Sequence, residues 1–293
     1  MRRNSVFAML AAMLLMPFAA QAADDAAEPE KNWKFPGDAA VKFTQSYFSE
    51  NWYKGGQSNI SLLSQFDQEA DYAKGNVTVD NKLEAKLGYY TTKTEDDRTM
   101  FKVNEDLLRL TSKFGMRAFK DWFYSAQIQG YTQFMNTYAD DNVTLESEFF
   151  APVYASASIG MDYKPTFDND KITLSLLLSP VAYNCRYVKD IELAPRFGIE
   201  PGKKFKQDIG SSAELNLKWN FWKMLTWTLK GQMFTSYGYI ETNIENTLDI
   251  TVTKFFGVQL FAHWRFDDSV DRNYDWGYNQ LKEFLTLNLT YNW

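Results

Sequence analysis

The chain has 293 residues, a formal net charge of -6 and 17% aromatic residues, and its mean hydropathy is negative. The acidic balance disfavours nucleic-acid binding, and the sequence has no apolar run long enough for a membrane helix. The single cysteine, Cys185, excludes an intrachain disulfide and a thiolate metal cluster, and we interpret it as a small filler in a loop or strand.

Residues 1–22 have the features of a secretory signal peptide: two positive residues, an apolar stretch and the small-residue sequence Ala-Gln-Ala. A buried core helix is the alternative, but the acidic segment that follows favours a cleaved, exported end. Removing Arg2 and Arg3 changes the net charge from -6 to -8. No cysteine follows the apolar stretch, so we expect no lipid anchor. Residues 23–37 are predicted to form a periplasmic N-terminal stub.

Alternation of apolar and polar residues predicts a series of two-faced β-strands in the rest of the chain. The clearest segments are, in chain order, 77–89, 105–117, 122–134, 151–163 and 213–221. Shorter alternating segments follow at 225–233, 248–252 and 258–264, whereas 39–47, 60–66 and 172–178 alternate less cleanly. In several of these segments charged residues recur at every second position, so one whole face is charged.

The last nine residues, LTLNLTYNW, place Leu285, Leu287 and Leu289 on one face and Thr286 and Asn288 on the other. The strand stops on Trp293, and a final strand that ends in an aromatic residue resembles the C-terminal targeting signal of bacterial outer-membrane barrels. We therefore expect this strand to engage the barrel-assembly machinery. A soluble β-sandwich also produces alternating strands, so alternation alone leaves both folds open.

Connection lengths favour the barrel. With the C-terminus on the periplasmic side, the connections near 48–56, 91–100, 137–148, 181–205, 237–245 and 268–279 fall outside the cell. Those near 70–75, 118–121, 165–169, 222–224 and 254–256 are shorter and fall on the periplasmic side. Short periplasmic turns and longer external loops are typical of outer-membrane barrels. The aromatic residues near the periplasmic connections agree: Trp122, Tyr163, Trp222, Trp227, Tyr291 and Trp293. We predict one transmembrane antiparallel up-and-down β-barrel of about twelve strands over residues 38–293.

Three blocks of sequence carry a family resemblance: NW-x-x-GG at 51–56, FFAPVYASASIGMDYKP at 149–165, and the ending RFDDS…WGYNQLKEFLTLNLTYNW. They resemble a family of predicted Gram-negative outer-membrane β-barrel proteins catalogued as domain of unknown function 3078. The motif residues are Asn51, Trp52, Gly55, Gly56, Asp267, Asp268, Lys282 and Glu283. KVNED at 102–106 departs from the family's Lys-polar-Asp-Asp run. The resemblance implies a barrel in the cell outer membrane and brings no established activity.

The double glycine of NWYKGG is predicted to be a turn rather than a phosphate-binding loop. A phosphate-binding loop follows a strand, precedes a helix and has Lys-Ser or Lys-Thr at its end. Here Lys54 precedes Gly55 and Gly56, and a strand follows. The glycines are free to adopt positive φ at a strand junction.

Charged side chains on the alternate strand faces are predicted to line the lumen: Lys82, Glu84, Lys86, Glu105, Arg109, Lys113, Glu214, Lys218, Lys230, His263 and Arg265. Twelve tilted strands give a backbone radius of about 12 Å, much of which side chains fill. The lumen is then either a narrow polar channel or closed by ion pairs of mixed sign. The interleaved signs favour a mostly filled lumen without strong anion selectivity.

We expect no metal, no cofactor and no enzymatic activity. His263 is the lone histidine, and the residue two positions on is Arg265, where an outer-membrane phospholipase has serine. The acidic loop clusters 95–97, 140–141 and 267–268 lack the spacing of a calcium loop, and we interpret them as solvated loop charges. Their alternative is bridging divalent cations to lipopolysaccharide phosphates.

Three functional hypotheses follow for a protein of the outer membrane, whose partners are membrane lipid and lipopolysaccharide. The first is a narrow pore for small polar solutes. The second is a lipid-modifying hydrolase or acyltransferase that uses His263. The third is a structural or surface-interaction barrel that makes contact through the 181–205 loop.

Overall fold

The computed structural model describes residues 32–46, 59–93, 99–139, 143–165, 167, 171–269 and 277–293. The predicted signal peptide and the motif residues Asn51, Trp52, Gly55 and Gly56 lie outside these described residues, as do the acidic clusters at 95–97 and 140–141.

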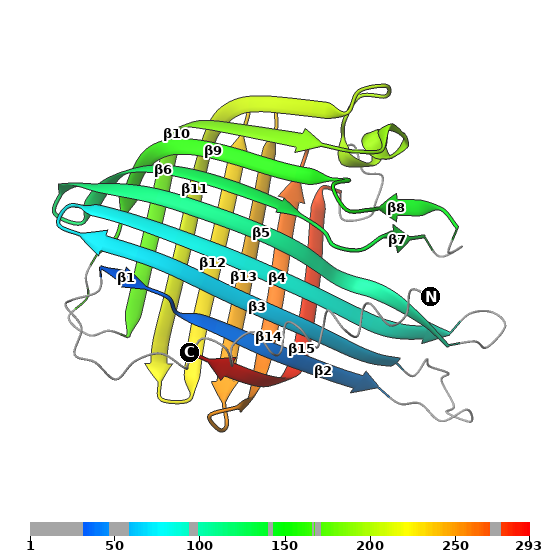
Figure 1. Cartoon of the computed structure of the whole chain (residues 1–293), viewed down its shortest axis with the longest axis horizontal. Coiled ribbons are helices and arrows are strands. Elements are labelled where there is room, and N and C mark those ends of the chain that lie inside the picture. Colours follow the sequence, from blue (N-terminus) through cyan, green and yellow to red (C-terminus); the bar gives the residue numbers. More distant parts are fainter. Residues whose placement is uncertain are drawn as a thin grey trace.

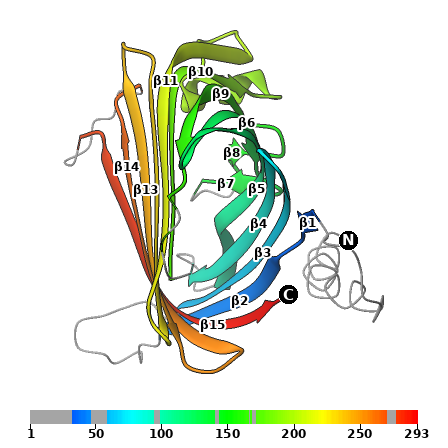
Figure 2. The same ribbon diagram turned by 90° about the vertical axis from the view of Figure 1, so that its left-hand side faces the viewer.

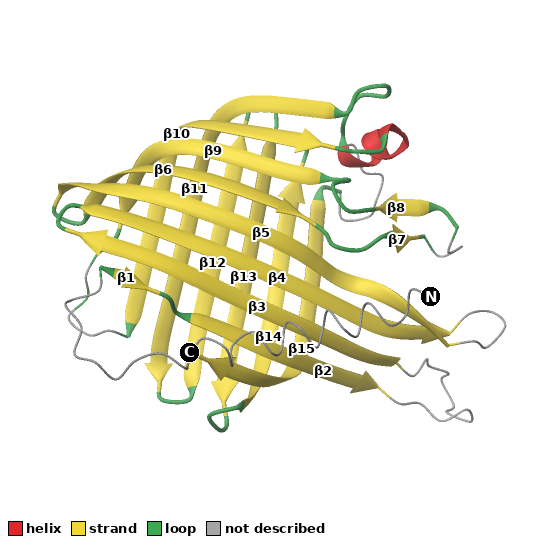
Figure 3. Cartoon of the chain, viewed as in Figure 1, coloured by secondary structure: helices red, strands yellow, loops and turns green. Residues whose placement is uncertain are grey.

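Fifteen strands and one short helix make up the described chain. The strands are Trp33–Lys34 (β1), Gly37–Ser46 (β2), Asn59–Lys74 (β3), Val77–Lys93 (β4), Thr99–Phe119 (β5), Trp122–Thr132 (β6), Thr137–Tyr138 (β7), Leu145–Ser147 (β8), Val153–Tyr163 (β9), Ile172–Tyr187 (β10), Phe205–Trp222 (β11), Leu225–Thr235 (β12), Ile240–Thr251 (β13), Phe256–Asp267 (β14) and Asn279–Asn292 (β15). The helix η2, Ile191–Phe197, is a 3₁₀ helix and is drawn red in Figure 3.

The long strands form one closed antiparallel barrel (Figure 1). Each strand pairs with the next along the chain, and the ring closes where Leu287 of β15 lies opposite Phe43 of β2. The two-residue strand β1 and strand β2 lie along the same edge of β3, so the wall has twelve strand positions. The predicted fold class, an all-β up-and-down barrel of about twelve strands, is confirmed. Figure 2 shows β11, β13 and β14 in one wall and β2 to β6 in the facing wall.

Side chains alternate between the outside and the inside of this wall. On β6, Ile128 is 62% exposed on the outer face, whereas the next residue inward, Gln127, is 6% exposed. The outer face carries exposed apolar residues on strand after strand, for example Leu110 on β5, Ile159 on β9 and Leu285 on β15. Period-2 alternation therefore gives an apolar exterior and a polar interior.

The two ends of the barrel differ in their connections. The short-turn end has connections at 75–76, 120–121, 164–171, 223–224 and 252–255. The opposite, long-loop end has connections at 47–58, 94–98, 133–152, 188–204, 236–239 and 268–278. The connections separate into the same two sets that the sequence predicts, one at each end of the barrel.

Two predicted external loops are too long. The predicted loop 237–245 is a turn at 236–239, because β13 begins at Ile240 and its charged residues Glu241 and Glu245 face the lumen. The predicted loop 181–205 begins at Val188, because β10 continues to Tyr187 through a β-bulge between Ser179 and Ala182. Polar residues and a proline suggested loops at positions where the strands continue.

Aromatic side chains gather on the outer face at the short-turn end, as predicted. The rings of Trp122 and Tyr163 lie 5.0 Å apart, and those of Tyr291 and Trp293 lie 6.0 Å apart. Trp293 also donates a hydrogen bond from Nε1 to Oε1 of Gln68, at 3.2 Å. The C-terminal aromatic residue is thus fixed against β3 beside the closing seam.

A small hydrophobic core lies outside the barrel wall, at the long-loop end. The connections 133–152 and 188–204 supply it, and we call their described parts the cap. Its buried members are Ala151, Val188, Leu193, Ala194 and Ile199. Gly198 ends η2 with φ 69°, a left-handed conformation that favours glycine. The cap is a packed element rather than an extended loop.

Candidate functional site

The candidate site is the barrel lumen, whose wall is built from the inward face of every strand. A cavity of about 1160 Å³ occupies the part of the lumen near the short-turn end. Residues of the 252–255 turn, Asn32 and Pro165 line the rim of this cavity. The cavity therefore extends to the short-turn end. Ten Lys and Arg side chains and nine Asp and Glu side chains are among its described lining residues. Charges of both signs are thus present in nearly equal number.

Ion pairs cross the middle of the barrel, at a level we call the waist. Glu84 on β4 accepts contacts from Arg109 on β5, at 3.3 Å, and from Lys230 on β12, at 3.4 Å. Strands β4 and β12 are six positions apart in either direction around the ring, so the second contact joins opposite walls. Glu84 is only 5% exposed, so its charge sits in the most enclosed part of the lumen.

Two further contacts narrow the waist. Nζ of Lys282 on β15 lies 2.5 Å from Oε2 of Glu105 on β5. Lys42 on β2 donates to Gln259 on β14 and to Gln65 on β3, at 2.8 Å each. The Lys282–Glu105 and Lys42–Gln259 contacts join non-adjacent strands, so these side chains fill part of the lumen cross-section.

A buried ion-pair cluster is centred on Asp162 of β9, whose side chain is fully buried. One carboxylate oxygen lies 2.7 Å from Nζ of Lys113, and the other accepts a hydrogen bond from Ser175, also at 2.7 Å. Nζ of Lys164 lies 3.5 Å from Asp162 and 2.7 Å from Asp80. The cluster joins strands β4, β5, β9 and β10 on the lumen side.

Cations and aromatic rings form a continuous row on the lumen wall. The row consists of successive cross-strand neighbours on β5, β6, β9 and β10, in the order Arg109, Tyr131, Tyr154 and Arg186. The tyrosine rings stack with centroids 4.7 Å apart. The guanidinium carbon of Arg109 lies 5.5 Å from one ring, and that of Arg186 lies 5.6 Å from the other. Cation–π contacts of this kind stabilise the row and connect the waist to the long-loop end.

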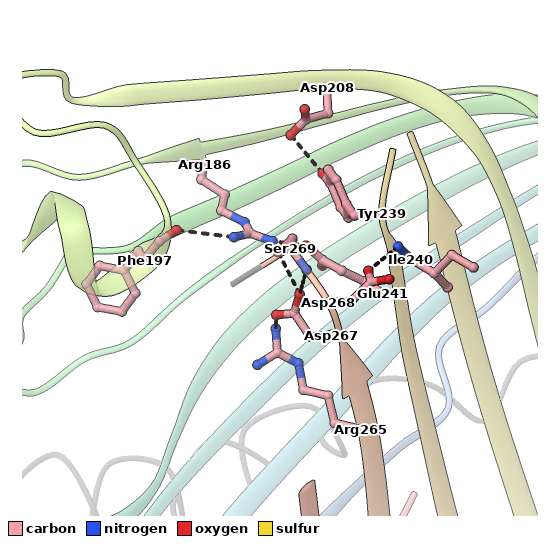
Figure 4. A network of polar contacts seen from close by, with 10 residues as sticks. All are labelled: Arg186, Phe197, Asp208, Tyr239, Ile240, Glu241, Arg265, Asp267, Asp268 and Ser269. Carbon is pink, nitrogen blue, oxygen red and sulfur yellow. Dashed lines mark hydrogen bonds and ion pairs between the residues drawn. The ribbon is translucent and has the colours of Figure 1, made fainter. Parts of the chain in front are cut away.

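A second polar network crosses the lumen at the long-loop end (Figure 4). Arg186 on β10 pairs with Glu241 on β13 and donates to the carbonyl oxygen of Phe197 in the cap, at 3.1 Å. Arg265 on β14 lies 2.7 Å from Asp267, which accepts hydrogen bonds from Ser269. Arg186 thus links the cap to β13, three strand positions away, and a cavity of about 100 Å³ lies beside this network.

The turn 236–239 folds against this network. The hydroxyl of Tyr239 donates to Asp208 at 2.8 Å. Burial and that hydrogen bond raise the pKa of Tyr239 above its ordinary value, so the hydroxyl stays protonated and remains a donor. Asp268 accepts a hydrogen bond from the backbone nitrogen of Ile240 at 2.5 Å, which fixes the start of β13.

The predicted lumen residues all lie on inward strand positions. The cavity is lined by Lys82, Glu84, Lys86, Arg109, Lys113, Glu214, Lys218 and Lys230. Lys82 pairs with Glu69 at 3.1 Å, and Glu214 accepts from Gln127 at 2.6 Å. Lys86 and Lys218 make no ion pair with any residue in the described part of the chain. On β14, His263 lies opposite Lys282 of the waist, and Arg265 lies one inward position further toward the long-loop end.

The family-motif residues that the structure describes separate into different roles. Asp267 and Asp268 belong to the network at the long-loop end, and Lys282 belongs to the waist. Glu283 is exposed at an outward position of β15, opposite Ala262. The lumen site therefore brings together three of these four residues and leaves Glu283 outside.

The sequence interpretation missed several residues of the site. Asp162, Arg186 and Glu241 were not among its candidates, although each makes an interior ion pair. Asp162 lies within the predicted strand 151–163 and shares the inward parity of Ser156 and Ser158, so the alternation of that strand is sufficient to identify it. Arg186 and Glu241 were assigned to loops, so no parity could be given to them.

The described part of the chain gives little support for metal binding or for nucleophilic catalysis. It contains no group of three or more His, Cys, Asp or Glu side chains arranged to hold a metal ion. His263 contacts the Asn243 amide oxygen at 3.3 Å and the Phe261 ring at 6.3 Å, and neither is a nucleophile. Among the described residues, no helical segment has the length and apolar character of a membrane span.

Comparison with solved structures returns outer-membrane channels at low similarity. An outer-membrane channel from Pseudomonas putida F1 is 13% identical, with 91% of this chain and 99% of that chain covered and a TM-score of 0.44. The channel DcaP of Acinetobacter baumannii is 9% identical, with 92% and 99% covered and a TM-score of 0.33. OprB of Pseudomonas putida is 8% identical, with 89% and 94% covered and a TM-score of 0.33.

These likenesses are too low to support an argument, and the barrel fold rests on the strand pairing described above. No curated protein matches the sequence significantly. Residues 43–138 match the family described as "Protein of unknown function (DUF3078)", which confirms the predicted family over this part of the barrel.

Proposed function

We propose that this protein is an outer-membrane β-barrel channel that passes small polar solutes through a narrow, charge-lined lumen. The carrying observation is the cavity of about 1160 Å³, which extends to the short-turn end and is lined by Glu84 and Lys230, the ion pair that joins opposite walls. A barrel built only as a structural support gains nothing from a large polar cavity lined by lysines such as Lys86, which forms no ion pair with the described residues.

The outer face supports a membrane location. Exposed leucine, isoleucine and phenylalanine side chains cover the strands, and aromatic residues mark the short-turn end. In an outer-membrane barrel the outward residues contact lipid while aromatic girdles lie at the interfaces. The closing strand that ends in Trp293 fits recognition by the assembly machinery.

The nearly equal numbers of acidic and basic side chains that line the cavity indicate which class of solute it suits. Lining residues of both signs sit within a few ångströms of one another, as in Lys82 with Glu69 and Lys164 with Asp80. An excess of one sign would attract one class of ion and repel the other. The mixed lining instead suits neutral polar or zwitterionic solutes.

Conductance of the refolded mature protein in a planar bilayer tests this function. We expect small, discrete single-channel steps with weak cation–anion selectivity. Folded protein, identified by its β-rich circular dichroism and heat-modifiable migration, that produces no steps would overturn the proposal.

A surface-interaction role is a second candidate, and the cap favours it. The cap has its own core, and Phe149, Phe150 and Ile191 are exposed on it. Replacing residues 189–203 by a short Gly-Ser linker tests this role against conduction. Loss of binding of intact cells to a host or phage surface, with conductance retained, favours the interaction role.

The hydrolase alternative depends on His263. In this protein that ring lies among lumen side chains, with Asn243 as its polar contact. His263→Ala should therefore leave the lipid profile of the cell unchanged. A changed profile would favour the alternative over the channel.

A further inference from the structure

The short-turn end carries lysines beside large apolar side chains in a repeated arrangement. Four of its five turns have this pair: Lys74 follows Tyr72, Lys120 lies between Phe119 and Trp122, Lys223 lies between Trp222 and Met224, and Lys254 precedes Phe255. The fifth connection, 164–171, contains two lysines together with Asp168 and Asp170. Because the turns are distributed around the barrel, the four lysines form a ring, which we call the lysine ring.

The lysine ring is exposed and free of internal partners. Lys74, Lys120, Lys223 and Lys254 are all exposed, and no described carboxylate lies within ion-pair distance of any of them. The lysines of the lumen behave differently, since Lys113, Lys230 and Lys282 each pair with a carboxylate. The ring therefore offers uncompensated positive charge to whatever lies beside the barrel.

The neighbouring side chains fix the depth of these amines relative to a bilayer. Trp222 is 71% exposed, and the Phe119 and Trp122 rings stack with centroids 6.3 Å apart. Tryptophan and other aromatic residues concentrate at the boundary between the hydrocarbon and the headgroups. A lysine one or two residues away from such a ring reaches the headgroup phosphates with its flexible stem.

Lys120 also occupies a backbone conformation that most residues avoid. Its φ is 46°, in the left-handed region where glycine or asparagine is favoured. The two-residue turn 120–121 thus keeps a lysine at a position where a smaller residue is less strained. The presence of lysine at this strained position is explained if its positive charge has a role.

The long-loop end lacks such a ring. Three of its described basic residues pair with neighbouring acids: Lys203 with Glu200 at 2.6 Å, Arg196 with Glu146 at 2.5 Å and Lys189 with Glu148 at 3.9 Å. Lys204 is exposed and forms no ion pair with the residues that the structure describes. The positive charge of that end is therefore largely neutralised locally. The difference between the two ends argues that the partner of the lysine ring is on one side only.

We propose that the lysine ring binds the phosphate headgroups of anionic phospholipids in the leaflet beside the short turns. The apolar and aromatic residues contact the acyl chains, and the amines contact the phosphates. Attraction between basic residues and an anionic leaflet accumulates residue by residue and weakens with salt. This role is independent of whether the lumen conducts.

Native mass spectrometry of the refolded, detergent-solubilised protein tests the proposal with dioleoylphosphatidylglycerol and dioleoylphosphatidylcholine as probes. The test variant carries Lys74→Gln, Lys120→Gln and Lys223→Gln, which leaves Lys254 at the cavity rim intact. The matched control carries Lys189→Gln, Lys203→Gln and Lys204→Gln, which removes the same charge at the long-loop end. Thermal melting followed by circular dichroism verifies that both variants fold.

The wild-type protein should bind phosphatidylglycerol more tightly than phosphatidylcholine, and the test variant should lose about tenfold in affinity for phosphatidylglycerol only. The control should stay within about twofold of the wild type. Unchanged phosphatidylglycerol binding by the test variant, or an equal loss in the control, overturns the proposal. Competition by free glycerol phosphate at equal concentration also overturns it, because the site would then recognise the phosphate without a lipid.

Discussion

At the scale of single residues, Glu84 decides how narrow the lumen is. Its carboxylate holds Arg109 and Lys230 toward one another from opposite walls. Glu84 and Lys230 both line the cavity, and both are predicted lumen residues. The sequence did not show that Glu84 and Lys230 pair, because β4 and β12 are separated by more than a hundred residues.

Glu84→Gln removes the charge that neutralises Arg109 and Lys230. We expect a larger single-channel conductance, because the cations are no longer held across the lumen. The reversal potential in a salt gradient should shift toward anions, since uncompensated positive charge remains. Glu69→Gln is the matched control, because Glu69 pairs with Lys82 at a half-exposed site in the wider part of the cavity. Equal effects of both substitutions would contradict a special role of the waist.

Asp162 contributes to stability rather than to passage. Its fully buried carboxylate compensates Lys113 and accepts from Ser175. Asp162→Asn leaves Lys113 without its partner in an enclosed site, so the free energy of unfolding in urea should fall by about 2–4 kcal/mol. Asp80→Asn removes a carboxylate that is 37% exposed, and its cost should be about 1 kcal/mol or less. Similar costs for the two variants would mean that the buried cluster is fully hydrated.

At the scale of elements, each strand has one lipid-facing side and one lumen-facing side, and β15 provides a direct test. Leu285 is exposed on the outside, and Thr286 faces the cavity side, where it contacts Asn288 at 3.0 Å. Leu285→Arg should destabilise the barrel by about 2–4 kcal/mol in lipid vesicles, because the guanidinium enters hydrocarbon. Thr286→Arg should cost less than half of that. A larger cost for Thr286→Arg would reverse the assigned faces.

Strand bounds were harder to predict than strand faces. The alternation in β4, β5 and β6 predicted inward and outward residues that the register confirms. The ends of β10 and β13 were missed, because Pro180 lies in a bulge and the start of β13 is polar on its lumen face. In a barrel the inward face of each strand is polar, so a polar residue does not distinguish a loop from a strand.

At the scale of the whole molecule, the two ends of the lumen are unequal. The large cavity reaches the short-turn end, whereas the Arg186–Glu241 pair and its neighbours cross the lumen toward the long-loop end. The cap packs against this end through the hydrogen bond from Arg186 to Phe197. Access to the cavity should therefore be faster from the short-turn side.

The Lys218→Cys substitution, made in a Cys185→Ser background, tests whether access to the cavity differs between the two ends. Lys218 lines the cavity and is exposed within it. A membrane-impermeant thiol reagent should modify the Lys218→Cys protein rapidly from the short-turn side of an oriented bilayer and slowly from the other side. Adding Arg186→Gln should raise the slow rate, because it breaks the pair with Glu241. Equal rates from both sides in the parent protein would contradict the unequal lumen.

Patterns in consecutive residues were enough to predict the barrel, the approximate number of strands, the two sets of connections and the signs of the charges that face inward. Period-2 alternation and connection lengths are local properties of the chain. Which of these charges meet depends on how the chain folds. Lys230 reaches Glu84, and Arg186 reaches Glu241, because ring closure and strand register bring distant strands within the length of two side chains. Those pairings determine where the lumen is open and where it is closed.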